Sequence, residues 1–197
     1  MTTLKIICPN GHLGFAPLKV PSFLVGVEQK PHYIAADSGS DDIGPVPLGT
    51  DTCASPKSWQ RHDLEQMLLS SRRLGVPMII GSAGDTGTNS RVDMFVEMIK
   101  EIAIEHKLSG FKIGYFYSEV DKQIIREKIN AGDSIRGLDR RSDLTLAELD
   151  STERVVAMAG VHPFMKLLAE GADVVKTILD NARTERGHFK FMDDYST

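Results

Sequence analysis

The chain repeats one local pattern five times: a short apolar run of strand type ends abruptly in glycine and small polar or acidic residues. In a parallel sheet flanked by helices, the carboxyl ends of the strands open on one edge, and ligands bind in the crevice there. The pattern therefore predicts a ligand site along that edge. The five runs are Leu4–Ile7, Tyr33–Ala36, Met78–Ile80, Lys112–Tyr117 and Val155–Ala159.

Helical patterns separate these runs, and a sixth strand is expected at Ala172–Thr177. The clearest helix opens at Ser90, because apolar residues from Val92 to Ala103 recur at the spacing of one helix face. The alternation predicts a Rossmann-like, doubly wound, mainly parallel sheet of about six strands with helices on both faces. The other expected helices are Leu18–Gln29, a long helix ending at Leu74, Asp121–Asn130, a capped turn in Leu144–Glu153, and Pro163–Glu170.

The segment Asp41–Ala54 has no periodicity and is long for a strand-to-helix connection. It is therefore a candidate lid or substrate loop. Ser55 and Pro56 follow it and predict the start of a helix, with Ser55 as the N-cap and Pro56 at the first helical position.

The length of 197 residues predicts a single α/β domain over residues 1–180 and a polar tail with a helical stub over residues 181–197. The formal net charge of −4 argues against a general nucleic-acid binder. No apolar run approaches the roughly 20 residues needed to span a bilayer. Cys8 and Cys53 are too few and too far apart for a disulfide framework. We therefore expect a cytoplasmic protein with no nucleic-acid or membrane partner.

The strongest candidate for a binding loop is Gly81–Arg91. Its glycines let the backbone approach a ligand closely, and the N–H groups of the following helix favour an anion. A Gly-rich turn that binds nothing is the alternative. The side chains that would add donors for a phosphate or carboxylate are Ser82, Thr86, Thr88 and Arg91.

Asp37 ends the second strand, where dinucleotide-binding folds hold a ribose hydroxyl. The first loop, Cys8–Gly14, lacks the full three-glycine fingerprint, which weakens a nucleotide interpretation. Asp37 with Asp41 or Asp42 would alternatively hold a divalent cation through oxygen ligands. A simple Asx turn is the third interpretation of Asp37.

His12 lies in the first loop among polar residues, and histidine titrates close to neutral pH, so His12 is a candidate general acid or base. His162 is a second candidate, at the end of the fifth expected strand. Glu119 and Asp121 offer a pair of carboxylates after the fourth strand, although an acidic helix start explains Asp121 equally well.

Four motifs resemble the acyclic terpene utilisation A-type family: Cys8-Pro-Asn-Gly-His-Leu-Gly-Phe15, Ala36-Asp-Ser-Gly-Ser40 with Asp42-Ile-Gly-Pro45, Gly81-Ser-Ala-Gly-Asp-Thr-Gly-Thr88, and Tyr117-Ser-Glu-Val-Asp-Lys122. The similarity runs to about Val175, and family members are usually longer. The resemblance implies that this chain corresponds to an amino-terminal portion, or to one subunit of a split protein. It also implies a role in the breakdown of branched acyclic acids as coenzyme A thioesters. The matching positions are Asn10, His12, Asp37, Ser38, Ser82, Asp85, Ser118 and Glu119.

These observations lead to two hypotheses. The first is an enzyme of lyase, hydratase or hydrolase type that acts on a small carboxylated or acyl-thioester metabolite. His12, with Asp37 or Glu119, would move the proton, and a divalent metal at Asp37, Asp42 and Asp85 is left open. The second is a non-catalytic subunit or binding domain that pairs with a separate C-terminal partner. In both cases we expect a homo-oligomer or a hetero-oligomer.

Overall fold

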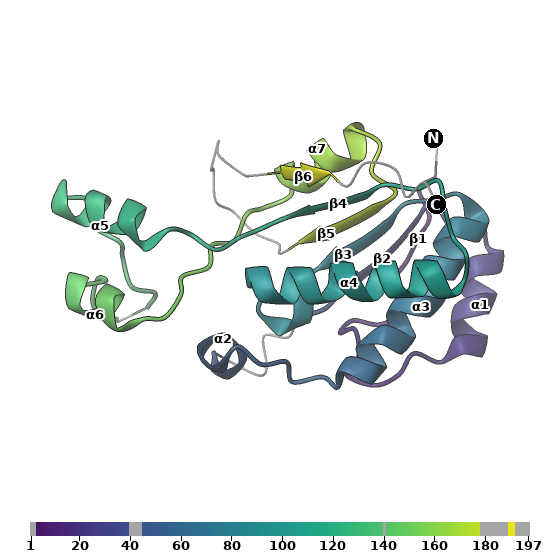
Figure 1. The fold of residues 1–197 in the computed structure, drawn as a ribbon, viewed down its shortest axis with the longest axis horizontal. Helices are drawn as coiled ribbons and strands as arrows, with labels where there is room; N and C mark the ends of the chain where they lie inside the picture. Colours follow the sequence, from purple (N-terminus) through teal and green to yellow (C-terminus); the bar gives the residue numbers. More distant parts are fainter. Residues whose placement is uncertain (1–2, 40–44, 140, 178–188, 192–197) are drawn as a thin grey trace.

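The structure, a computed structural model, describes residues 3–39, 45–139, 141–177 and 189–191. Its centre is a six-stranded sheet in the order β1-β2-β3-β5-β4-β6 (Figure 1). Five strands run parallel, and β6 pairs antiparallel with β4. The strands are β1 (Ile6–Ile7), β2 (Tyr33–Asp37), β3 (Met78–Gly81), β4 (Ile113–Phe116), β5 (Val174–Thr177) and β6 (Phe189–Phe191).

Helices cover both faces of the sheet, which confirms the predicted Rossmann-like α/β fold. On one face lie α1 (Val20–Glu28), α3 (Lys57–Leu74) and α4 (Asn89–Glu105), and on the other lies α7 (His162–Ala169) (Figure 1). The remaining helices are α2 (Val46–Thr50), α5 (Lys122–Asn130) and α6 (Leu146–Ser151).

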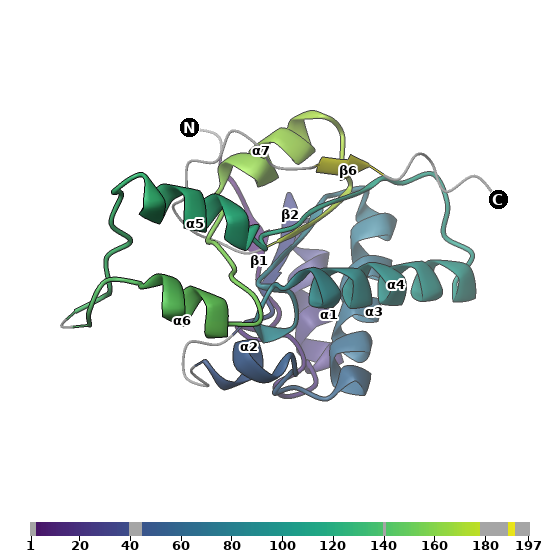
Figure 2. The same cartoon turned by 60° about the vertical axis from the view of Figure 1, so that its left-hand side comes forward.

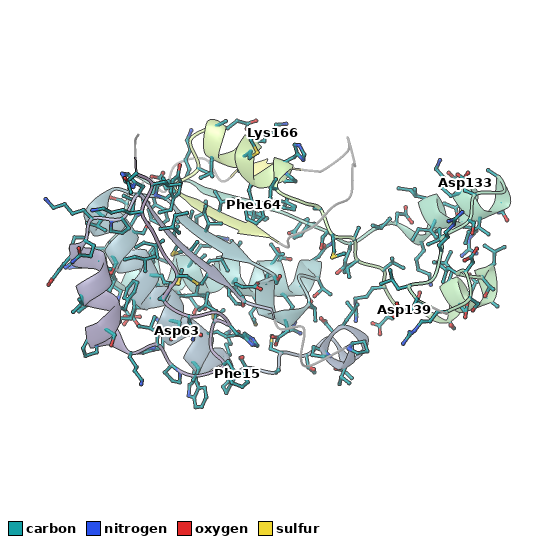
Figure 3. The ribbon with its side chains drawn as sticks, turned by 180° about the vertical axis from the view of Figure 1, so that it is seen from behind. Phe15, Asp63, Asp133, Asp139, Phe164 and Lys166 are labelled. Carbon is teal, nitrogen blue, oxygen red and sulfur yellow. The ribbon has the colours of Figure 1, made fainter. Side chains whose placement is uncertain are left out.

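Alternation along the strands divides the buried apolar side chains into separate clusters. On β5, Val174 faces the large cluster beneath α1, α3 and α4, whereas Val175 faces a small cluster beneath α7. Figure 3 shows Phe164 of α7 on the inner side of its helix, beside the sheet. The predicted apolar face of α4 is confirmed, because Val92, Phe95, Val96, Ile99, Ile102 and Ala103 are all buried.

The prediction of a sheet strand at Val155–Ala159 is wrong. This segment instead forms one leg of a two-legged stalk, in which Val120 donates its N–H to the carbonyl of Val155 at 2.9 Å and Ala157 donates to Ser118 at 2.8 Å. The stalk carries α5 and α6, which project away from the sheet in both Figure 1 and Figure 2. Pairing within the stalk satisfies backbone groups that a sheet strand would have used.

The C-terminal segment also differs from the expectation. Its described part, Phe189–Phe191, is strand β6 rather than a helical stub, because the edge of β4 offers unpaired backbone groups. The other expected features of residues 181–197 lie outside the described residues.

The chain just before α3 also differs from the expectation in two respects. The segment expected to lack structure contains α2, and its residues 41–44 lie outside the described part. The N-cap of α3 is Pro56, with no side-chain cap, so Ser55 is not the cap. Among the described residues, none of the helices has the length and apolar character that a membrane crossing requires.

Candidate functional site

The loop after β3 is built on a strained backbone. Ser82 and Asp85 both have left-handed backbone angles, with φ of 44° and 70°. Such angles are uncommon outside glycine and concentrate at functional sites. Ser38, fully buried after β2, holds the loop: its carbonyl accepts from the N–H of Asp85 at 2.8 Å and its hydroxyl accepts from the N–H of Gly84 at 3.2 Å. These two hydrogen bonds connect the residue after β2 to the loop after β3.

His12, Asp85 and Ser55 meet at this edge. The Nε2 atom of His12 lies 2.8 Å from Oδ1 of Asp85 and 3.3 Å from the hydroxyl of Ser55. The side chain of Asp85 is fully buried and that of His12 is 11% exposed. Oδ1 of Asp85 has no aligned hydrogen bond within the described residues, and Nε2 of His12 is its close polar neighbour. A histidine held beside a buried carboxylate at a ligand-binding edge is placed to act as a general acid or base.

The loop that carries His12 is fixed by Asp63 of α3, a fully buried residue that Figure 3 places inside the body of the fold. Its carboxylate accepts the N–H groups of Gly14 at 3.0 Å and Leu18 at 2.8 Å. Asn10 donates to the same carboxylate at 3.3 Å and accepts the N–H of His12 at 3.2 Å. Asn10 therefore positions the loop and, through it, His12.

The start of α4 binds a carboxylate from within the chain. The hydroxyl of Ser90 donates to both oxygens of Asp51, at 2.9 and 3.2 Å, and Thr88 donates at 3.3 Å. Arg91 contacts the Asp51 carboxylate at 3.4 Å and its backbone carbonyl as well. Burial would raise the pKa of Asp51, but the Ser90 hydrogen bond and the charges of Arg91 and Arg154 outweigh it and lower that pKa.

Asp51 belongs to a segment that contacts the site at several successive positions, which we call the covering segment, Asp51–Ser55. The thiol of Cys53 donates to the carbonyl of Gly84 at 3.4 Å. The N–H of Ala54 donates to Asp85 at 2.6 Å. With Asp51 and Ser55, these contacts hold the segment against the start of α4, the loop of Asp85 and His12.

Most of the other predicted site residues form hydrogen bonds with backbone groups at the same edge of the sheet. Asp37 accepts the N–H groups of Ser38 at 2.8 Å and of residue 39 at 3.1 Å, as in an Asx turn. Glu119 accepts the N–H of Asn89 at 2.8 Å, at the start of α4, and Ser118 donates to Gly87 at 3.1 Å. The hydroxyls of Thr86 and Thr88 are 3.1 Å apart. His162 begins α7 instead of ending a strand.

Among the described residues, one group has side-chain atoms close enough to share a metal ion: Glu65, Glu105 and His106. Arg61 pairs with both carboxylates, at 3.5 Å from Glu65 and 2.5 Å from Glu105. The group lies at the far end of α4 from the loop of Asp85. Of the suggested metal ligands Asp37, Asp42 and Asp85, Asp42 lies outside the described residues.

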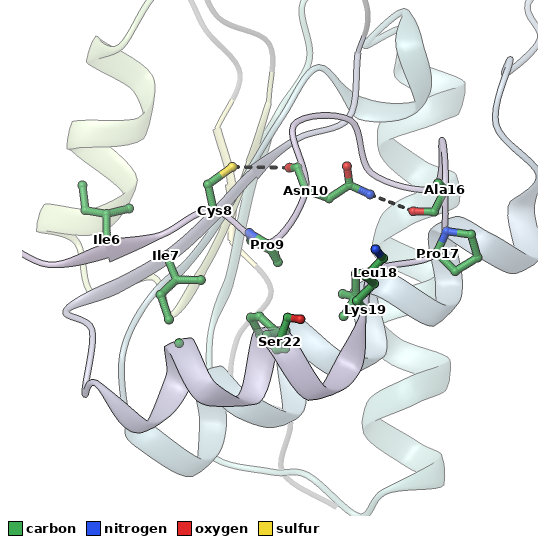
Figure 4. A pocket seen from close by; sticks show the side chains of 12 residues that line it. Ile6, Ile7, Cys8, Pro9, Asn10, Ala16, Pro17, Leu18, Lys19 and Ser22 are labelled. Carbon is green, nitrogen blue, oxygen red and sulfur yellow. Dashed lines mark hydrogen bonds between the residues drawn. The ribbon is translucent and has the colours of Figure 1, made fainter.

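A groove of about 620 Å³ lies on the outer flank of the first loop, between β1 and α1 (Figure 4). Ile6, Ile7 and Phe23 form its apolar wall, and Asn10 and Lys19 its polar rim. The groove does not include His12 or Asp85. The side chains of His12, Asp85 and Ser55 lie together at the strand ends, and such a cluster indicates a reactive site more directly than a groove without it. We therefore place the candidate site at His12 and Asp85.

Sequence reasoning missed the roles of Asp51, Ser55 and Asp63. The segment Asp41–Ala54 was predicted as a candidate lid or substrate loop, but the contacts of Asp51–Ser55 were not predicted, because their partners are 31 to 43 residues away in the chain. Asp63 gave no signal, because an aspartate within a helix is usually solvated. No family model, curated protein or solved structure matches the chain.

Proposed function

We propose that the chain is an enzyme that transfers a proton on a small carboxylated or acyl-thioester metabolite, with His12 as the acid–base group. The observation that carries the proposal is the contact of His12 Nε2 with the buried Asp85 carboxylate, at the edge of the sheet where ligands bind. The resemblance of the loop motifs to the acyclic terpene utilisation A-type family supports an acyl-thioester substrate.

The geometry favours a lyase or hydratase over a serine hydrolase. In a serine hydrolase, the carboxylate and the serine contact opposite nitrogens of the histidine. Here Asp85 and Ser55 both contact Nε2. Asp85 would stabilise the imidazolium, and Nδ1 would exchange the proton with substrate. Thr88, Ser90 and Arg91 would hold the substrate carboxylate or thioester oxygen.

Deuterium incorporation tests the proposal. The full chain is incubated in D₂O with a panel of branched acyl coenzyme A thioesters and their free acids, and the mass of each compound is followed. Exchange or turnover by the wild type should fall by about 10²- to 10⁴-fold in His12→Gln.

His106→Gln is the matched control, because His106 also contacts a carboxylate, Glu65 at 2.5 Å, at the other end of α4. It should retain wild-type exchange. Equal exchange in wild type and His12→Gln, or no reaction with any compound of the panel, contradicts the proposal.

A second candidate is a binding subunit that associates with another copy of the chain. Ile6 of β1, an edge strand of the sheet, and Leu4 just before it favour this candidate, because they are 57% and 60% exposed. Exposed apolar edges promote association. Light scattering at micromolar concentration should then give a dimer or larger species that Ile6→Lys dissociates. A monomeric wild type would exclude this candidate.

A further inference from the structure

We propose that the covering segment is an internal competitor: the Asp51 carboxylate occupies the place at the start of α4 where a ligand carboxylate binds, and it is displaced when one binds. The inference rests on the proposed function, since it concerns the same site. It adds a means by which ligand binding uncovers the acid–base pair.

The groups around Asp51 are those that a ligand carboxylate would need. Two hydroxyls, from Thr88 and Ser90, donate to it. Arg91 contacts it at 3.4 Å, and Arg154, which pairs with Glu153 at 2.7 Å, lies 4.0 Å away. Two hydroxyl donors and the Arg91 guanidinium make this an anion site, and Asp51 shows that a carboxylate fits it.

Polar contacts alone attach the covering segment. Among the described residues, none from 45 to 55 belongs to an apolar cluster, and Pro47 is the one buried residue of α2. The Asp51 side chain is 30% exposed, and its backbone is left-handed with φ of 51°. Because no apolar cluster of the described residues anchors the segment, a ligand that supplies equivalent polar contacts can displace it at small cost.

Displacement of the segment also affects His12. Ala54 donates its N–H to Asp85, and Cys53 contacts the backbone of that loop. When Asp51 leaves the start of α4, these contacts are released as well, and the buried Asp85 and its histidine become accessible. Binding of the anionic end of a ligand thus opens the place where its reacting carbon must lie.

The test measures carboxylate affinity with isobutyrate as the probe, followed by the backbone amide signals of Ser90 and Arg91 in NMR spectra of the full chain. Asp51→Asn keeps the size of the side chain but removes the competing charge. If Asp51 is seated about 90% of the time, its removal should tighten isobutyrate binding about tenfold. Arg91→Gln, added to Asp51→Asn, should abolish the gain.

Asp121→Asn is the matched control, because Asp121 accepts the N–H of Gln123 at the start of another helix, α5. It should leave isobutyrate affinity unchanged. An Asp51→Asn affinity equal to that of the wild type overturns the inference.

If Asp51→Asn does not fold, hydrogen exchange in the wild type decides. Saturating isobutyrate should speed the exchange of amides 46 and 48–54 about tenfold or more, and unchanged exchange overturns the inference. Failure of the proposed function is distinguishable. In that case no compound reacts, whereas the effect of Asp51→Asn on isobutyrate binding remains.

Discussion

A single carboxylate, Asp63, organises the loop that positions His12. It accepts two backbone N–H groups, from Gly14 and Leu18, and both bonds are buried. We predict that Asp63→Ala lowers the free energy of unfolding by about 3–5 kcal/mol, because it leaves both N–H groups without an acceptor. Urea unfolding measures the change. Asp121→Ala, which removes a capping carboxylate on α5, should cost only about 1 kcal/mol, and an equal cost for the two variants would contradict this role of Asp63.

Tyr117 gives the chain a pH-dependent stability at alkaline pH. Burial, together with the hydrogen bond and charge of Asp93 at 2.5 Å, raises the pKa of Tyr117 above its ordinary value. In the unfolded chain tyrosine ionises near pH 10. As the pH rises above about 10, the unfolded chain releases this proton while the folded chain keeps it, so stability falls. The contribution is fully present below that pH.

We therefore predict that Tyr117→Phe reduces the alkaline loss of stability, measured by urea unfolding between pH 8 and pH 11. Asp93→Asn should also reduce it, because the negative partner of Tyr117 is removed. An alkaline loss as steep in Tyr117→Phe as in the wild type would show that other groups cause it.

At the scale of elements, periodicity predicted the helices well and the strands less well. The apolar face of α4 follows a long regular repeat, and all of its predicted positions are buried. The run Val155–Ala159 has the composition of a strand but pairs within the stalk, because its partner is decided by tertiary contacts. The loops of His12 and Asp85 were predicted at one edge, since parallel topology places strand ends together. The segment Asp41–Ala54 was predicted as a candidate lid or substrate loop, but its partners were not, because contacts over more than 30 residues leave no local pattern.

Close packing between α7 and the sheet depends on Gly114 of β4. A Cβ atom at this position would lie 3.0 Å from Ala172 and 3.1 Å from Leu167. We predict that Gly114→Ala destabilises the fold by about 1–3 kcal/mol in chemical denaturation, because α7 must shift. Gly49→Ala is the matched control: nothing lies within 4 Å of its added methyl group, and helix propensity should stabilise α2 slightly. An equal change in stability for the two variants would mean that α7 accommodates the added methyl group without loss of stability.

At the scale of the whole molecule, the apolar core is divided unequally by the sheet. Among the described residues, the cluster beneath α1, α3 and α4 contains nineteen buried residues, and the cluster beneath α7 contains five. Burial of apolar area is the main source of stability, so the two faces should not open with equal ease. The site lies at the carboxyl ends of β2 and β3, which pack on the larger cluster through Ala36 and Ile80.

We therefore predict that α7 opens locally while α4 exchanges its amides only on global unfolding. Two fully buried residues test this by hydrogen exchange, Ile99 of α4 and Leu167 of α7. Ile99→Ala should speed exchange in every slowly exchanging element, because a core cavity costs about 2–5 kcal/mol of global stability. Leu167→Ala should speed exchange mainly in α7 and β5 and leave α4 slow. If both variants instead lose protection equally in all elements, the two clusters form one cooperative unit and the site is not anchored on the larger one alone.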